Sequence, residues 1–236
     1  MLRSIFGEPP REWQGPLQDT VQTIERFARL MRDKGRGEAG SAVKFRKYAI
    51  WSEGLLRSLD ELEQSKYAAE RYAAKVAKPS VDEMSSAERL NYYRHVYYDK
   101  NAYIRVFSLL DKLGMLLNET LGLRTERIKS RFSYFTVLRG MRGSERHVRL
   151  AEALNEWKEK HQDALNRLRK RRNMEIHHMN AEFQDDLLHS LNPDTGSAHL
   201  ENIAANMNDL EEGWEMAWRT LDLSFRYLLK QGSQMA

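Results

Sequence analysis

The chain has 236 residues, enough to bury a sizeable core in one large domain or two small ones. It contains no cysteine, which excludes disulfides, thiolate metal sites and a cysteine nucleophile, and favours a cytoplasmic protein over a secreted one. A formal net charge of +4 is compatible with nucleic-acid binding, and the absence of any apolar run of about 18 residues excludes a membrane-spanning helix.

Helical periodicity begins close to the N-terminus. Apolar residues in the range 17–31 recur every three or four positions, with Pro16 suited to the first turn and Gly35 to the end. A second helix carries its apolar stripe over residues 48–62 and continues through an alanine-rich segment until Pro79 stops it. These two patterns predict two amphipathic helices in the first third of the chain.

The rest of the sequence continues in the same way. The longest predicted helix covers about residues 87–121, and a short aromatic segment follows at 132–135. A fourth helix carries a stripe over residues 148–168, and a loop at 191–197 separates it from the last helix, whose stripe covers 200–228.

No segment alternates between apolar and polar residues with period two, so the sequence predicts no strand. The predicted fold is all-α, an antiparallel helical bundle of five or six helices. We expect residues 1–80 to form an N-terminal helical extension packed on a bundle of residues 81–236. We expect no membrane partner.

One basic segment differs from the surrounding helices, because five of the six residues from 167 to 172 are basic and a polar cluster with two histidines follows. One interpretation is a solvated helix face whose histidines lie near a helix C-terminus, where the dipole favours cations. The other is a site for a phosphodiester. Its basic residues are Arg167, Arg169, Lys170, Arg171 and Arg172.

The second interpretation rests on the residue types at the end of this segment. Arg172 offers a planar, permanently charged fork for phosphate oxygens, and His177 carries a side chain whose proton can move near neutral pH. Asn173 lies four residues before His177, so it shares a helix face with the histidine and could orient its ring. Arg172 and His177 lie about 140° apart around a regular helix, which favours a composite site across a pocket edge or a subunit interface.

The sequence Arg172-Asn173-x-x-x-His177 resembles the Arg-Asn-x-x-x-His signature of the HEPN superfamily, a group of helical nucleotide-binding domains. The upstream segment Tyr103–Leu113 is similar to the long helix that precedes this motif in a bacterial branch with clostridial representatives. The resemblance covers about residues 87–229 and leaves the first two helices unexplained.

This resemblance implies a homodimer in which two motifs face each other across one RNA-cleaving groove. It implies metal-independent cleavage, in which the ribose 2′-hydroxyl attacks the adjacent phosphate, and a role in toxin–antitoxin or defence systems. Arg172 would stabilise the charge on the phosphoryl oxygens, His177 would act as general acid or base, and Asn173 would position it. The predicted RNA contacts are Arg167, Arg169, Lys170 and Arg171.

Two further sets of residues have alternative interpretations. The polar stripe of the third helix is either a solvated or salt-bridged face, or it places Arg105 and Asp111 where they support the Arg172–His177 site. A metal site from His177 or His178 with Glu175 and Glu182 lacks the His-x-x-x-His spacing of zinc helices, so we expect no metal and no cofactor.

Aromatic residues are dense at the start of the third helix. Tyr92, Tyr93, Tyr97 and Tyr98 either line a dimer face or stack on bases, and we favour the dimer face. The non-enzymatic alternative is a catalytically inactive all-α interaction or ligand-binding module, in which the N-terminal helices bind a partner protein. The sequence contains no helix-turn-helix element, phosphate-binding loop or nucleophile elbow.

Overall fold

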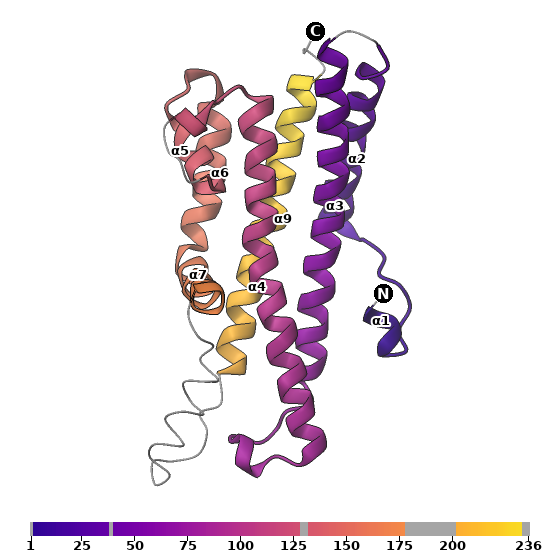
Figure 1. The fold of residues 1–236 in the computed structure, drawn as a ribbon, viewed down its shortest axis with the longest axis vertical. Coiled ribbons are helices and arrows are strands. Elements are labelled where there is room, and N and C mark those ends of the chain that lie inside the picture. Colours follow the sequence, from indigo (N-terminus) through magenta and orange to yellow (C-terminus); the bar gives the residue numbers. More distant parts are fainter. Residues whose placement is uncertain (1, 38–39, 128–131, 178–201, 233–236) are drawn as a thin grey trace. The chain divides into compact units, whose positions relative to one another are not determined.

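The computed structural model describes residues 2–37, 40–127, 132–177 and 202–232, and within these ranges every regular element is helical (Figure 1). The predicted all-α class is confirmed. Of the described helices, none combines the length and apolar composition needed to cross a bilayer. The α-helices are α1 (Leu2–Ile5), α2 (Gly15–Lys34), α3 (Gly40–Ala73), α4 (Ser86–Thr120), α5 (Tyr134–Arg142), α6 (Val148–Lys160), α7 (Gln162–His177) and α9 (Ile203–Gly232).

The helix ends follow the local signals in the sequence. Pro16 lies in the first turn of α2, and the N–H of Gly35 donates to the carbonyl of Met31 at its end. Helix α3 ends at Ala73, a few residues before Pro79. The predicted loop at 191–197 lies outside the described residues.

The described chain forms two compact units. Unit 1 contains residues 2–10, 62–105, 162–177 and 202–214, and unit 2 contains residues 11–37, 40–61, 106–127, 132–161 and 215–232. Helices α3, α4 and α9 each contribute one stretch to each unit. The units draw on segments from both sides of residue 80, and the boundary expected there from the sequence stays a prediction.

The core of unit 2 contains a pair of packed phenylalanines and a close approach of α5 to α4. Phe27 and Phe225 lie edge to face, with ring centroids 5.5 Å apart, and both are fully buried. A Cβ atom on Gly114 would lie 3.0 Å from the Cα of Tyr134, so glycine at this position lets α5 approach α4. The Asp111 carboxylate accepts a hydrogen bond from the Tyr134 N–H at 2.8 Å, at the N-terminus of α5.

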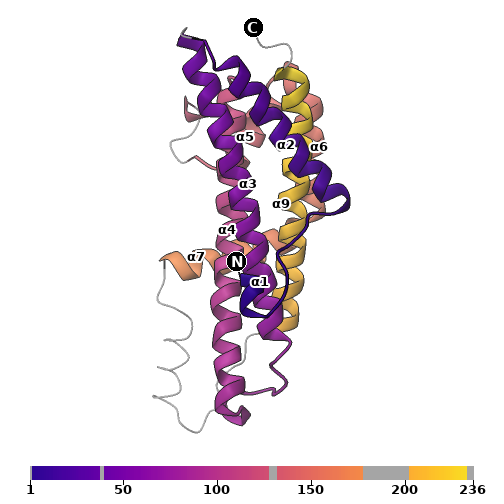
Figure 2. The same cartoon turned by 90° about the vertical axis from the view of Figure 1, so that its right-hand side faces the viewer.

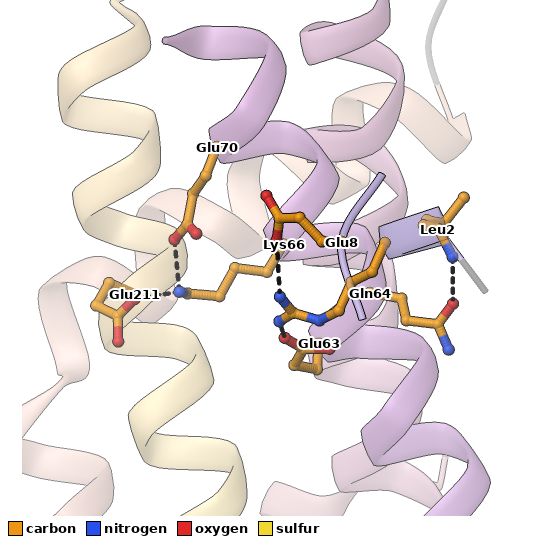
Figure 3. Close-up of polar contacts among 8 residues, drawn as sticks. Leu2, Glu8, Glu63, Gln64, Lys66, Glu70 and Glu211 are labelled. Carbon is orange, nitrogen blue, oxygen red and sulfur yellow. Dashed lines mark hydrogen bonds and ion pairs between the residues drawn. The ribbon is translucent and has the colours of Figure 1, made fainter. Parts of the chain in front are cut away.

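Unit 1 is held together by ion pairs as well as apolar contacts. Arg3 of α1 pairs with Glu63 at 2.5 Å, and its guanidinium lies over the ring of Tyr67. Lys66 bridges Glu70 on its own helix and Glu211 on α9 (Figure 3). Burial lowers the pKa of Lys66, but the hydrogen bonds that its ammonium donates to Glu211 and Glu70 outweigh this effect, so the net pKa is raised.

Candidate functional site

Helix α7 carries the candidate site and belongs to unit 1. It begins at Gln162, directly after α6, which ends at Lys160 with His161 as its C-cap residue. The single fourth helix expected from the sequence is therefore two helices. Figures 1 and 2 show α7 running crosswise to the stretches of α4 and α9 in the same unit, and its last turn stands clear of α4 in Figure 2.

Three faces of α7 differ in burial and in charge. The apolar face is buried in unit 1 and consists of Ala164, Leu165 and Leu168. On the flank beside it, every fourth residue forms an ion pair; these residues are Arg167, Arg171 and Glu175. The outward face is exposed and carries Lys170, Asn173 and His177.

Arg171 forms the most buried of these ion pairs. Its guanidinium pairs with Asp99 of α4, whose side chain is 1% exposed, and lies 4.7 Å from the ring centroid of Tyr103. A carboxylate buried this deeply needs a charged partner, because its desolvation is otherwise uncompensated. Arg171 therefore attaches α7 to α4, and its charge is matched within the chain.

Arg167 has a similar role toward α9. Its Nε and terminal nitrogen make a forked contact with Asp209, at distances of 2.7–3.0 Å. Hydrogen bonding to Asp209 raises the pKa of Arg167, and the Asp209 side chain is 6% exposed. A third pair, Lys100 with Glu175 at 3.1 Å, connects α4 to the last turns of α7.

Two of the four expected RNA contacts, Arg167 and Arg171, thus have carboxylate partners inside unit 1. Their contact with RNA stays a prediction. Of the other two, Lys170 is exposed and Arg169 is half-buried. Lys170 is consequently the member of the basic run that is most open to an external phosphate.

The three residues expected to act in catalysis do not share one face of the helix. Asn173 and His177 lie together on the outward face and are exposed, as their spacing of four predicts. Arg172 follows Leu165 and Leu168 by seven and four positions, so it lies on the line of the buried stripe and is half-buried. One chain presents the arginine and the histidine in different directions.

The expected supporting residues fall in different units. Arg105 is half-buried on the part of α4 in unit 1, the unit that also contains α7. Asp111 belongs to unit 2, where it accepts the hydrogen bond at the start of α5. The contact with α5 gives Asp111 a structural role that the spacing in the sequence did not indicate.

The residues considered for a metal site lie partly inside and partly outside the described part of the chain. Within that range, no three histidine, aspartate or glutamate side chains are grouped as a metal site would require. His178 and Glu182 lie outside it, as does any cluster that they would join.

The four tyrosines near the start of α4 divide into a packed pair and an exposed pair. Tyr92 is buried, and Tyr98 stacks on Tyr72 with a centroid distance of 5.7 Å. Tyr93 and Tyr97 are 55% and 61% exposed, and with them Leu90 forms an exposed stripe at positions i, i+3 and i+7. Of the four tyrosines expected at a dimer face, Tyr93 and Tyr97 are thus the exposed ones, and the dimer stays a prediction.

Sequence reasoning did not identify the charged partners of α7. Asp99, Asp209 and Lys100 lie at least 40 positions from the α7 residues that they contact, and no local motif marks them. The available signal was an aspartate on an otherwise apolar helix face, since Asp99 lies four residues before Tyr103 and is fully buried.

Comparison with protein families gives the motif a context. A family model described as Cthe2314-like HEPN matches residues 51–229, well over half of the chain. The match begins earlier than the residue 87 expected from the sequence and includes α4, α7 and most of α3. No curated protein and no solved structure matches the chain. The chain belongs to the Cthe2314-like HEPN family, which confirms the superfamily indicated by Arg172-Asn173-x-x-x-His177.

Proposed function

We propose that this protein binds RNA and cleaves it without a metal ion, through attack of a ribose 2′-hydroxyl on the adjacent phosphate. The observation that carries the proposal is the exposed face of α7, where Lys170, Asn173 and His177 lie at positions i, i+3 and i+7 within the region matched to the HEPN family.

This chemistry requires a side chain that transfers a proton, a side chain that orients it, and a fixed positive charge. His177 takes the proton of the 2′-hydroxyl as its oxygen bonds to phosphorus, and the bond from phosphorus to the 5′-oxygen breaks. The leaving 5′-oxygen receives a proton from water, so the products are a 2′,3′-cyclic phosphate and a 5′-hydroxyl. Asn173 lies one helical turn from His177, where its amide can orient the ring, and the fixed charge of Arg172 stabilises the phosphoryl oxygens.

Positions on the helix favour a site built by two chains. Arg172 and His177 of one chain lie about 140° apart around α7, too far to converge on one phosphate. A symmetric dimer would supply Arg172 from one chain and His177 from the other. The exposed stripe of Leu90, Tyr93 and Tyr97 is apolar enough to contribute to such an interface.

Mixing two inactive variants tests this arrangement. Arg172→Ala and His177→Ala homodimers each lack one group in both composite sites, whereas a mixed dimer keeps one complete site. Co-refolded or co-expressed variants should therefore regain activity that neither variant shows alone. The matched control mixes His177→Ala with a double variant that lacks both groups, and recovery in that control would contradict the two-chain site.

A comparison of RNA with strands that lack the 2′-hydroxyl tests the substrate class. Because DNA lacks the attacking hydroxyl, a DNA strand of the same sequence should remain intact in EDTA while RNA is cut. An RNA with a single 2′-deoxy substitution at the cleaved position should resist cleavage there. Cleavage of the DNA strand would contradict the proposed chemistry.

The second candidate is a catalytically inactive HEPN-like interaction module, and one observation favours it. Arg167 and Arg171, two of the five cations of the basic run, have carboxylate partners within unit 1. Cations that form ion pairs within the chain stabilise the fold and need not contact a substrate. Intact RNA under all conditions, together with a stable dimer, would support this candidate over the enzyme.

A further inference from the structure

A hollow lies between α3 and α4 in unit 2, and the proposed RNA chemistry does not use it. One pocket of about 270 Å³ is lined by Ile50, Trp51, Gly54, Arg57, Lys112 and Met115. It shares Trp51 and Met115 with a larger pocket of about 600 Å³, so the two form one depression, here called the α3–α4 groove.

The floor of the groove is apolar and open. Ile50 is 61% exposed and Met115 is 46% exposed, which is unusual for large apolar side chains on amphipathic helices. Val43, also 61% exposed, lies seven positions before Ile50 on the same face of α3. Phe132, 37% exposed, lines the larger pocket together with Met115.

Gly54 makes the groove deep. A Cβ atom at this position would meet only a terminal nitrogen of Arg57, at 3.8 Å, so nothing in the fold requires a glycine there. Glycine inside a helix costs about 0.5–1 kcal/mol relative to alanine. The residue leaves open the space that a side chain would fill between Ile50 and Met115.

The margin of the groove is positively charged. Lys47 is matched by Glu119, and Glu126 accepts a hydrogen bond from Asn118 at 3.0 Å. Four other cations line the groove and have no carboxylate partner within the described part of the chain: Lys44, Arg57, Lys112 and Arg124. The cations of α7 differ from these four, because Arg167 and Arg171 have carboxylate partners within unit 1.

We propose that the α3–α4 groove binds an acidic amphipathic helix from a partner protein. The apolar stripe of such a helix packs on Ile50 and Met115, and its flanking carboxylates face Arg57 and Lys112. The exposed face of α3 from Val43 to Arg57 is about 21 Å long, which matches a helix of about four turns.

Other occupants fit the groove less well. A second copy of the chain would place this cationic margin against a like-charged margin in a symmetric contact. Unpaired RNA needs aromatic faces for its bases, whereas the Trp51 ring already has the Lys47 ammonium 5.1 Å from its centroid, and the other exposed groups are mainly aliphatic. The mainly aliphatic surface of the groove therefore fits the aliphatic face of a helix better than it fits RNA bases.

The test uses a fluorescein-labelled synthetic peptide of about 16 residues, with leucines at i, i+3, i+7 and i+10 and glutamates at the flanking positions. Fluorescence anisotropy with the full chain should show saturable binding. A peptide with the same composition in scrambled order, and one with lysine in place of glutamate, should bind at least about tenfold more weakly.

Two variants assign the binding to the groove. Gly54→Leu fills the hollow while favouring the helix, and Arg57→Glu reverses a charge at its margin, so each should weaken binding about tenfold or more. Gln22→Leu adds the same apolar group to an exposed position on α2 and should leave binding unchanged. Circular dichroism verifies that each variant is folded.

Three results would overturn the proposal. The first is the absence of saturable peptide binding, or binding that Gly54→Leu does not weaken. The second is groove-dependent binding of labelled oligouridine or of anionic vesicles in preference to the peptide. The third is a change of oligomeric mass in Gly54→Leu, which would assign the groove to a second copy. Failure of peptide binding leaves the proposed RNA cleavage untouched, because the two tests use different residues. A change of oligomeric mass would bear on both, because the proposed cleavage site is built by two chains.

Discussion

Arg171 of α7 pairs with Asp99 of α4, and this aspartate side chain is 1% exposed. The two residues are 72 positions apart in the sequence, and their contact attaches the helix that carries the HEPN motif to the longest helix of the described chain. The ion pair explains why part of the basic run has a structural role.

Replacing Asp99 by alanine should therefore lower the free energy of unfolding by about 3–5 kcal/mol, because it leaves a largely buried guanidinium without its partner. Urea denaturation followed by circular dichroism measures the change. Asp33→Ala breaks the exposed pair with Arg36 and should cost less than about 1 kcal/mol. Equal costs for the two variants would contradict the structural role of Arg171.

Lys170→Ala should weaken RNA binding without altering stability, since Lys170 is exposed on the outward face of α7. The slope of log affinity against log salt concentration should become shallower by about one, as for the loss of one phosphate contact. Lys230→Ala removes the same charge from α9 and should leave the slope unchanged. An identical effect of both variants would indicate a general loss of charge and not a contact.

Asp111→Ala should lower the free energy of unfolding by about 1–2 kcal/mol, because its carboxylate accepts the Tyr134 N–H at the start of α5. Cleavage per folded molecule should remain as in the wild type. The two quantities are measured on the same preparations, by urea denaturation and by an RNA assay. Lost cleavage with unchanged stability would instead assign Asp111 the supporting role expected from the sequence.

His147 should make stability depend on pH. Burial lowers the pKa of His147. A hydrogen bond with the backbone of Leu121 opposes this effect, and the nearby charge of Arg146 adds to it, so the net pKa is lowered. The Nδ1 atom of His147 lies 2.7 Å from the Tyr227 hydroxyl. A lowered pKa in the folded state means that the unfolded chain binds the proton more tightly. The contribution is therefore fully present above the ordinary pKa of about 6.5 and is lost as the pH falls below it.

The comparison of wild type with His147→Gln isolates this effect. The difference in unfolding free energy between the two proteins should be greatest near about pH 8 and should shrink toward about pH 5. A difference that grows on acidification would show that the pKa is raised in the folded state.

Local signals predicted the helices well, because proline and glycine positions and the apolar period depend only on neighbouring residues. Pro16, Gly35 and Pro79 lie at or near helix ends as expected. The break between α6 and α7 at His161 was not predicted, since the apolar stripe continues through it. The partners of Arg167 and Arg171 also lay beyond prediction, because they depend on which helices pack together.

The candidate site was predictable only in part for the same reason. The shared face of Asn173 and His177 follows from a spacing of four on any helix. The half-buried position of Arg172 follows from the alignment with Leu168, which the sequence also contains. The α3–α4 groove depends on a missing side chain at Gly54 and on two helices that adjoin, and periodicity alone indicates neither.

The most direct measurement is the cleavage of a 5′-labelled RNA by the purified protein in EDTA, with and without His177. The wild type should leave a 2′,3′-cyclic phosphate, and His177→Ala should reduce the rate by about 10²–10⁴-fold, as for the loss of a general acid or base. Arg172→Ala should reduce it by about 10²–10³-fold. Equal rates for wild type and His177→Ala, whether both are inert or both are active, would contradict the proposed function.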